Sequence, residues 1–322
     1  MSAWRAFQNV CLSLVLALTC TAVLAAPDPK ANPADPEKVL RVAFPVPETG
    51  FDPVRVNDLY SNTITAAIFQ PLLTYDWMAM PTQIVPNAAE SMPEISADNI
   101  TYTFKVKKGL YFTPDEAFKG QRRELTAQDF VYTLLRHADP KNRSPQVSDF
   151  DDKVFGFAES RKKAVASGKF DYDQKHPGIY ALDRYTLAIK LVQPDRNFLS
   201  LLTNPFAGGM AREVVEKYGF EGIMSNPVGT GPYMLEKWVR GSKIILKANP
   251  EFPGFVWDFQ PPPNKPVELR IASQMQGRKM PQIGRIEVSI IEEPQSMWLA
   301  FSGKEIDAVA VPPSFIENAL TP

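Results

Sequence analysis

Thirty of the 322 residues are proline, and no other feature of this sequence restricts the possible folds as strongly. The proline frequency is about twice the usual ~5%. Proline lacks a backbone N–H and disrupts the interior of a helix or of a central strand, so the chain needs many turns and short elements. This composition excludes a long helical bundle. With 44% hydrophobic residues, the chain is long enough to bury a core in one or two domains.

Residues 1–26 have the pattern of a cleavable signal peptide. Arg5 provides a positive charge, and the stretch from Val10 to Leu24 is predominantly apolar before Pro27 makes the sequence polar. This stretch is shorter than the ~20 apolar residues that span a bilayer, which favours cleavage over the alternative of an uncleaved anchor. We therefore expect export to the periplasm, with residues 27–37 as a flexible N-terminus of the mature chain.

Both cysteines, Cys11 and Cys20, lie within the expected signal peptide. A mature chain without cysteine excludes disulfides, zinc–thiolate sites and thiol catalysis. Leu18 and Thr19, which precede Cys20, match a lipid-attachment motif poorly, so we expect no lipid anchor at Cys20. The formal net charge of −1 and the lack of a basic cluster argue against a nucleic-acid partner.

Strand and helix patterns alternate irregularly along the rest of the chain, which indicates a mixed α/β fold. The strand pattern is clearest at 100–106, where Tyr102 and Phe104 face one side, and a capping-box pattern at Thr126 and Asp129 begins a helix that ends before Pro140. We also expect strands at 39–44, 185–191, 285–291 and 306–311, a hairpin of 233–240 and 243–248, helices at 59–69, 211–218 and 294–301, a surface insertion at 141–178 and a proline-rich loop at 249–284.

No group of residues in the sequence has the pattern of a catalytic or metal site. The spacing of His137 and His176 matches no metal-ligand motif, and His137 is expected at a helix C-terminus, where the helix dipole favours a cation. The run from Gly229 to Tyr233 (Gly-Thr-Gly-Pro-Tyr) lacks the lysine of a phosphate loop and is interpreted as a tight turn. We therefore expect no catalytic residue, no metal and no cofactor, which favours a binding protein over an enzyme.

Four groups of short segments follow one another in a specific order. They are Phe51-Asp52-Pro53 with Gln70-Pro71-Leu72-Leu73; Tyr102-Thr103-Phe104 with Lys108-Gly109-Leu110-Tyr111-Phe112 and Leu125-Thr126-Ala127-Gln128-Asp129-Phe130; Asn226-Pro227-Val228-Gly229-Thr230-Gly231-Pro232-Tyr233 with Trp238, Gly241 and Asn249-Pro250; and Ile286-Glu287-Val288 with Ser302-Gly303-Lys304-Glu305-Ile306-Asp307. In order and spacing they resemble the bacterial extracellular solute-binding proteins of family 5, the peptide- and nickel-binding class of ABC importers. The resemblance covers roughly residues 39–311.

The resemblance implies a protein of two lobes that enclose a ligand between them. By analogy, residues 38–80 and 195–308 form the mixed sheet of a periplasmic-binding-protein-like first lobe, and residues 81–194 form a smaller inserted subdomain. Residues 309–322 correspond to the hinge and the start of the second lobe. Because family members are considerably longer, the expectation is that the second lobe is missing from this chain.

The resemblance also implies that the first-lobe wall of the ligand cleft follows the first strand. The candidate wall residues are Asn57, Tyr60, Ser61 and Asn62, together with the turn that contains Asn204 and Phe206. Tyr60 can stack on a ligand or donate a hydrogen bond to it, or it can be an ordinary packing residue of its helix. Asn62 can likewise be an ordinary residue on the helix surface, without contact to a ligand.

The function implied by the resemblance is capture of peptides or a related small solute for an ABC permease in the inner membrane. The protein is expected to act as a monomer. The alternative is a truncated fragment without transport activity. Because one wall of a cleft leaves much of a ligand in water, weak binding or none is expected of the 322-residue chain.

Overall fold

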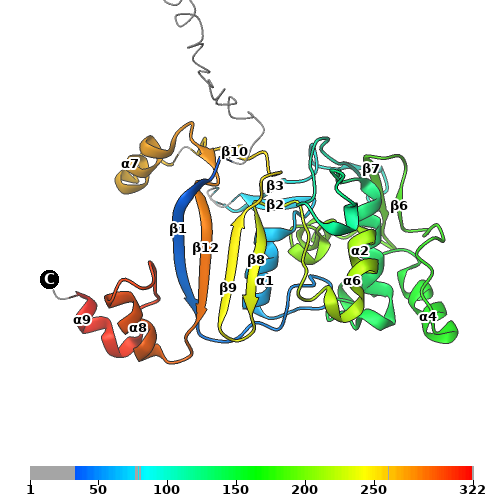
Figure 1. The fold of residues 1–322 in the computed structure, drawn as a ribbon. Coiled ribbons are helices and arrows are strands. Elements are labelled where there is room, and N and C mark those ends of the chain that lie inside the picture. The colour runs from blue at the N-terminus through cyan, green and yellow to red at the C-terminus, as the bar shows by residue number, and fades with distance from the viewer. Residues whose placement is uncertain (1–32, 77–78, 80, 260, 321–322) are drawn as a thin grey trace, which may run out of the picture.

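Two four-stranded sheets organise the chain in the computed structural model, which describes residues 33–76, 79, 81–259 and 261–320 (Figure 1). The first sheet has the order β1-β12-β9-β8 and the second has the order β4-β5-β7-β6. One continuous apolar core includes residues from both sheets and from the helices between them. The mixed α/β class expected from the sequence is therefore confirmed, while the assignment of residue ranges to a lobe and a subdomain stays a prediction.

The first sheet joins strands from both ends of the described chain. β1 (Asp35–Phe44) pairs in parallel with β12 (Ile283–Ile290), whereas β9 (Lys243–Ala248) is antiparallel to both β12 and β8 (Tyr233–Val239). One face is apolar, with buried side chains such as Ile244 and Leu246. On the other face, Lys243 Nζ lies 2.7 Å from a Glu287 carboxylate oxygen. The alternation of apolar and charged side chains follows the two-residue period of a strand, although Ile245, on the face of Lys243, is also buried.

The second sheet is built from one continuous stretch of the chain, between Glu94 and Lys190. It contains β4 (Glu94–Ile95), β5 (Thr101–Lys105), β6 (Ile179–Ala181) and β7 (Thr186–Lys190), all in antiparallel pairs. Tyr102 and Phe104 are buried, as the alternation in the sequence predicted. α2 (Ala127–Ala138) packs against β6 and β7 and lies on this side of the molecule in Figure 1.

The remaining elements are mostly short. They are the strands β2 (Leu73–Asp76), β3 (Gln83–Pro86), β10 (Phe255–Val256) and β11 (Lys279–Met280); the α-helices α1 (Leu59–Ile68), α3 (Ser148–Asp151), α4 (Phe157–Ser167), α5 (Phe198–Leu201), α6 (Arg212–Gly222), α7 (Pro266–Met275), α8 (Pro294–Ser302) and α9 (Ile316–Leu320); and the 3₁₀ helices η1 (Glu116–Phe118), η2 (Pro140–Asn142), η3 (Pro205–Ala207) and η4 (Pro313–Phe315).

Local sequence signals fix the ends of several helices. The Asp58 carboxylate accepts a hydrogen bond from the Ser61 N–H at 2.7 Å and caps α1. At the start of α2, the Asp129 carboxylate accepts from the Thr126 N–H at 2.7 Å, which confirms the capping-box interpretation. In α6, Gly219 adopts a φ of +66° and ends the first helical stretch where the sequence predicted it.

Three expectations from the sequence were wrong. The proline-rich segment 249–284 is not only a loop, because it contains α7 and the hairpin of β10 and β11; a proline in the first turn of a helix, as Pro266 is in α7, costs no hydrogen bond. The segment 141–178 is not simply a surface insertion, since Phe150, Val154 and Phe157 belong to the core.

The expected last strand at 306–311 does not form. Instead, Asp307 closes the edge of β1 from a turn: its carboxylate accepts from the Arg41 N–H at 2.7 Å, and its own N–H donates to the Arg41 carbonyl at 2.8 Å. A single residue, through its side chain and its backbone N–H, thus replaces a paired strand at this position.

Candidate functional site

The loop and helix that follow β1 hold four of the six candidate wall residues. Asn57 is exposed, while Tyr60 and Asn62 are half-buried. The Tyr60 ring lies 4.6 Å from the Phe44 ring, centroid to centroid, so it is anchored on one side by the end of β1. These residues offer an aromatic ring and two amide side chains next to the C-terminal end of the first strand.

Ser61 has a different environment. It is fully buried, and its Oγ accepts a hydrogen bond from the Thr49 N–H at 3.0 Å. The Ser61 hydroxyl therefore holds the loop before α1 in place, and we leave it out of the proposed wall.

Asn204 and Phe206 also have structural contacts. The Asn204 Nδ2 donates to the Ser200 carbonyl at 3.0 Å, and the Phe206 ring packs edge-on against Phe150. Phe206 is buried. Asn204 is half-buried, like Tyr60, but its amide is already used within its own turn, and the Phe206 ring is committed to the core.

A chain of buried hydrogen bonds connects the two predicted wall segments. The Gln146 Nε2 donates to Asn57 Oδ1 at 3.3 Å, and the Gln146 N–H donates to Ser144 Oγ at 3.2 Å. His137 continues the chain, with Nδ1 2.6 Å from Ser144 Oγ and Nε2 3.0 Å from the Phe206 carbonyl. Sequence reasoning missed Ser144 and Gln146 because they lie in the segment that was expected to be a surface insertion.

His137 is neutral, which corrects the expectation of a cation at the helix C-terminus. The residue is fully buried, and burial lowers its pKa to about 4, with the neighbouring Arg136 charge acting in the same direction. In the neutral ring, Nε2–H donates to the Phe206 carbonyl and Nδ1 accepts from the Ser144 hydroxyl. Burial outweighs the helix dipole at this position.

The buried histidine gives a specific pH dependence. Its folded pKa of about 4 lies below the unfolded value near 6.5, so the unfolded state binds the proton first and stability falls as pH drops through this window. We expect about 2–3 kcal/mol to be lost from the free energy of unfolding between pH 7 and pH 4.5 through this group. Urea unfolding of wild type and His137→Gln at both pH values measures it. An equal pH-dependent loss in the variant would contradict the assignment.

A buried ion pair holds the Phe51-Asp52-Pro53 segment against α2. Arg136 reaches Asp52 with two hydrogen bonds, from Nη1 to Oδ1 at 2.9 Å and from Nη2 to Oδ2 at 2.8 Å. Both side chains are almost completely inaccessible to solvent. The sequence singled out Asp52 but not its partner, which lies 84 positions away.

The glycine-rich turn packs against the end of α1. The Gly231 N–H donates to the Ile68 carbonyl at 2.7 Å, and Asn249 Nδ2 donates to the Gly231 carbonyl at 2.7 Å. A Cβ on Gly229 would lie 2.0 Å from the Ile68 carbonyl oxygen. The motif therefore builds the junction between α1 and the first sheet.

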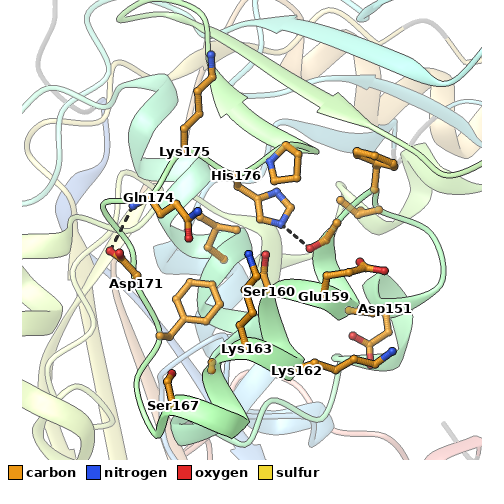
Figure 2. Close-up of a pocket in the computed structure, with 18 of the residues that line it drawn as sticks. Asp151, Glu159, Ser160, Lys162, Lys163, Ser167, Asp171, Gln174, Lys175 and His176 are labelled. Carbon is orange, nitrogen blue, oxygen red and sulfur yellow. Dashed lines mark hydrogen bonds between the residues drawn. The ribbon is translucent and has the colours of Figure 1, made fainter.

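One cavity of the structure is lined by none of the predicted wall residues. Its volume is about 810 Å³, and it is lined by α4 and by the facing segment 169–177 (Figure 2). His176 lies in its lining, fixed by hydrogen bonds that its Nδ1 accepts from the Gly178 and Ile179 N–H groups. Four lysines and four acidic residues line the cavity, so its charge selects no class of ligand. None of the six candidate wall residues contributes to it.

Metal-binding groups and membrane-spanning helices are the two other features considered. Within residues 33–320, apart from the positions left undescribed, no three His, Cys, Asp or Glu side chains form a group that could hold a metal ion. In the same part of the chain, every helix is too short or too polar to cross a lipid bilayer. The expected signal peptide at 1–26 lies outside the described residues.

Sequence comparison finds a family and several relatives. Residues 83–321 match the family described as bacterial extracellular solute-binding proteins, family 5 Middle. The chain is 26% identical over 264 residues to the periplasmic oligopeptide-binding protein OppA of Salmonella typhimurium, covering 81% of this chain and 45% of OppA. It is 28% identical over 242 residues to a probable deoxycholate-binding periplasmic protein of Escherichia coli, YgiS, covering 75% of this chain and 42% of YgiS. The chain thus spans about half the length of the curated relatives it matches.

Solved structures share the fold. Listeria monocytogenes OppA bound to peptide superposes with a TM-score of 0.67 at 19% identity, covering 89% of this chain and 49% of that protein. Helicobacter pylori DppA in complex with the peptide STSA gives a TM-score of 0.63 at 24% identity, covering 87% and 48%. The family match covers most of the sequence, and the sheets, the Asp52–Arg136 pair and the glycine-rich turn account for the motifs that first suggested it. The chain belongs to the bacterial extracellular solute-binding proteins of family 5.

Proposed function

We propose that this chain is a periplasmic substrate-binding component of an ABC importer, which captures peptides or a related small solute for a membrane permease. The observation that carries the proposal is the family match over residues 83–321. The relatives named above support it, because they are described as binding proteins for oligopeptides or for deoxycholate. In this proposal residues 1–26 direct export and are removed, and the mature protein acts as a monomer.

The ligand-facing wall is proposed to consist of Asn57, Tyr60 and Asn62. These side chains keep accessible surface, unlike Ser61 and Phe206. Tyr60 supplies a ring held in place by Phe44, and a rigid amphipathic ring is suited to pack on a ligand while its hydroxyl donates a hydrogen bond. The main sheet at residues 38–80 and 195–308 supports this wall, and residues 81–194 are the proposed subdomain.

Removing the Tyr60 ring is expected to weaken peptide binding about tenfold, because a ligand loses its aromatic contact. Isothermal titration of the chain from Pro27 onwards, with peptides of two to five residues at millimolar concentration, measures the effect. Leu59→Ala is the matched control, since Leu59 is the exposed neighbour on the same helix. We expect Leu59→Ala to bind like wild type.

Two further ligand classes make the experiment decisive about function. Nickel complexes, a ligand class that the family resemblance implies, and deoxycholate, which the description of the relative YgiS names, are added to the same protein. Equal affinity of wild type and Tyr60→Ala for a peptide would remove Tyr60 from the wall but leave the function intact. Because this chain supplies one wall of a cleft, weak binding is the expected positive result. Saturable binding of none of the ligands, even at millimolar concentration, would favour the alternative of a fragment without transport activity over the proposal.

A further inference from the structure

A second pocket lies between η2, the C-terminal end of α4 and α6. It is lined by residues of the segments 139–143 and 164–170 and by Phe220, and we call it the η2–α6 pocket. Its volume is about 550 Å³. In the proposed division of the chain, the two segments belong to the subdomain and Phe220 to the lobe of the main sheet. Small-molecule sites are commonly pockets of about 300–1,000 Å³ at such junctions.

Large apolar side chains form part of the lining. Phe170 is buried and belongs to the core, whereas Val165 is 64% exposed and Phe220 is 39% exposed. The Phe220 ring is held in place by Arg55, whose guanidinium carbon lies 3.5 Å from the ring centroid and whose Nη1 donates to the Phe220 carbonyl. An apolar group that entered the pocket would remove these surfaces from water, which is favourable.

Three basic side chains surround the apolar part of the lining. They belong to Lys141, Arg143 and Lys169, and all three residues are exposed. Within the described part of the chain, neither Lys141 nor Arg143 has an ion-pair partner. Lys169 forms no ion pair with a described residue either, although its charge interacts with that of Asp173. The cations are therefore available to an anion from outside the chain.

The one acidic residue of the lining is already used within the fold. Asp139 is buried; its Oδ1 accepts from the Lys141 N–H at 3.0 Å, and its Oδ2 accepts from the Tyr172 hydroxyl at 2.7 Å. With three basic residues and one acidic residue, the lining has a net charge of +2. The charges of this pocket thus favour an anion, unlike the balanced charges of the cavity beside His176.

We propose that the η2–α6 pocket binds a small molecule that combines an apolar body with a carboxylate. The apolar body packs against Val165 and Phe220, and the carboxylate faces Lys141 and Arg143. A protein partner fits the pocket less well, because a stable protein interface covers about 800 Å² on each side, more than a pocket of this size offers. The proposal is independent of the proposed function, since none of the ligand-wall residues lines the pocket.

Titration calorimetry with octanoate tests the proposal on the chain from Pro27 onwards, which keeps every described residue. Octyltrimethylammonium has the same apolar chain with the opposite charge, and acetate has the carboxylate without the chain. We expect saturable binding of octanoate, at least about tenfold tighter than that of either comparison compound. Raising the ionic strength from about 0.01 M to about 0.5 M should weaken octanoate binding, because exposed charges are screened by salt.

Variants at exposed positions locate the site without disturbing the core. Val165→Glu places a negative charge on the apolar lining and should weaken octanoate binding at least about tenfold. Arg143→Gln removes one cation and should weaken it about fivefold. The matched controls are Ala166→Glu and Lys163→Gln, because both residues are exposed on α4 and neither lines this pocket. Both controls should bind octanoate like wild type, and circular dichroism should show the same fold for all variants.

Three results would overturn the proposal. The first is that wild type shows no saturable binding of octanoate, or binds it no more tightly than Val165→Glu and Arg143→Gln do. The second is displacement of octanoate by a peptide of two to five residues, which would place octanoate at the ligand wall. The third is binding of an acidic, leucine-rich peptide without binding of octanoate, which would assign the pocket to a partner protein.

Discussion

Replacing Arg136 by Met alone is expected to lower the free energy of unfolding by about 3–5 kcal/mol. The substitution leaves the Asp52 carboxylate buried without its two charge-assisted hydrogen bonds, and a buried, unpaired charge is strongly destabilising. Chemical unfolding at neutral pH measures the loss. The control is Arg41→Met, which removes a partly exposed pair in which Arg41 Nη1 and Asp307 Oδ2 are 3.9 Å apart; such pairs contribute about 0–1 kcal/mol.

A double variant separates the charge effect from a packing effect. Arg136→Met combined with Asp52→Asn removes both charges and is expected to recover part of the lost stability, since an unpaired carboxylate is no longer buried. If Arg136→Met lowered the free energy of unfolding no more than Arg41→Met does, the Asp52–Arg136 pair would not hold the segment 51–53 against α2.

Gly229→Ala is the second change with a large expected effect. The added Cβ would lie 2.0 Å from the Ile68 carbonyl oxygen and 2.7 Å from its carbon, so the junction between α1 and the sheet must separate. We expect a loss of at least about 3 kcal/mol, the upper part of the range for overpacking. Thermal unfolding measures it, and Gly231→Ala, with a contact of 2.6 Å to the Ala67 carbonyl oxygen, gives a less severe case if the first variant does not fold.

Gly241→Ala is the control for the glycine comparison. Gly241 has a φ of +65° in the hairpin turn, but its Cβ would meet no atom within 4 Å. Only backbone strain is then introduced, which costs about 1–2 kcal/mol. Similar losses for Gly229→Ala and Gly241→Ala would mean that the close approach to α1 can relax, against our interpretation of the motif.

The sequence predicted elements well where local signals decide them. The alternation at 100–106, the Asp58 cap of α1 and the hairpin around Gly241 depend on neighbouring residues, and the structure confirms all three. α7 was missed because six prolines between 250 and 266 dominated the interpretation of that segment. The strand at 306–311 was wrong because an alternating pattern does not say whether a partner strand is free to pair.

The candidate site was predicted only in part. The sequence and the resemblance singled out Asn57, Tyr60 and Asn62, which lie in and just before the first turn of α1 and keep accessible surface; their place in a ligand wall stays a prediction. They could not show that the Ser61 hydroxyl is used by the Thr49 N–H, or that His137 is buried and links to the Phe206 carbonyl 69 positions away. Burial and long-range hydrogen bonds follow from tertiary packing, which no local pattern records.

The pairing of β1 with β12 has a consequence for the order in which the chain folds. β1 is the first described strand, yet its partner β12 follows almost all of the described chain, whereas β4 to β7 pair within a contiguous range. The widest pair of the second sheet, Thr101 with Lys190, lies 89 positions apart, against 248 for Asp35 with Ile283, and a shorter loop costs less entropy to close. During synthesis from the N-terminus, the second sheet can therefore assemble while β1 still presents an unpaired edge. Until β12 is made, the unpaired edge of β1 leaves the N-terminal part of the nascent chain prone to aggregation. A chaperone that binds extended segments would act on this strand.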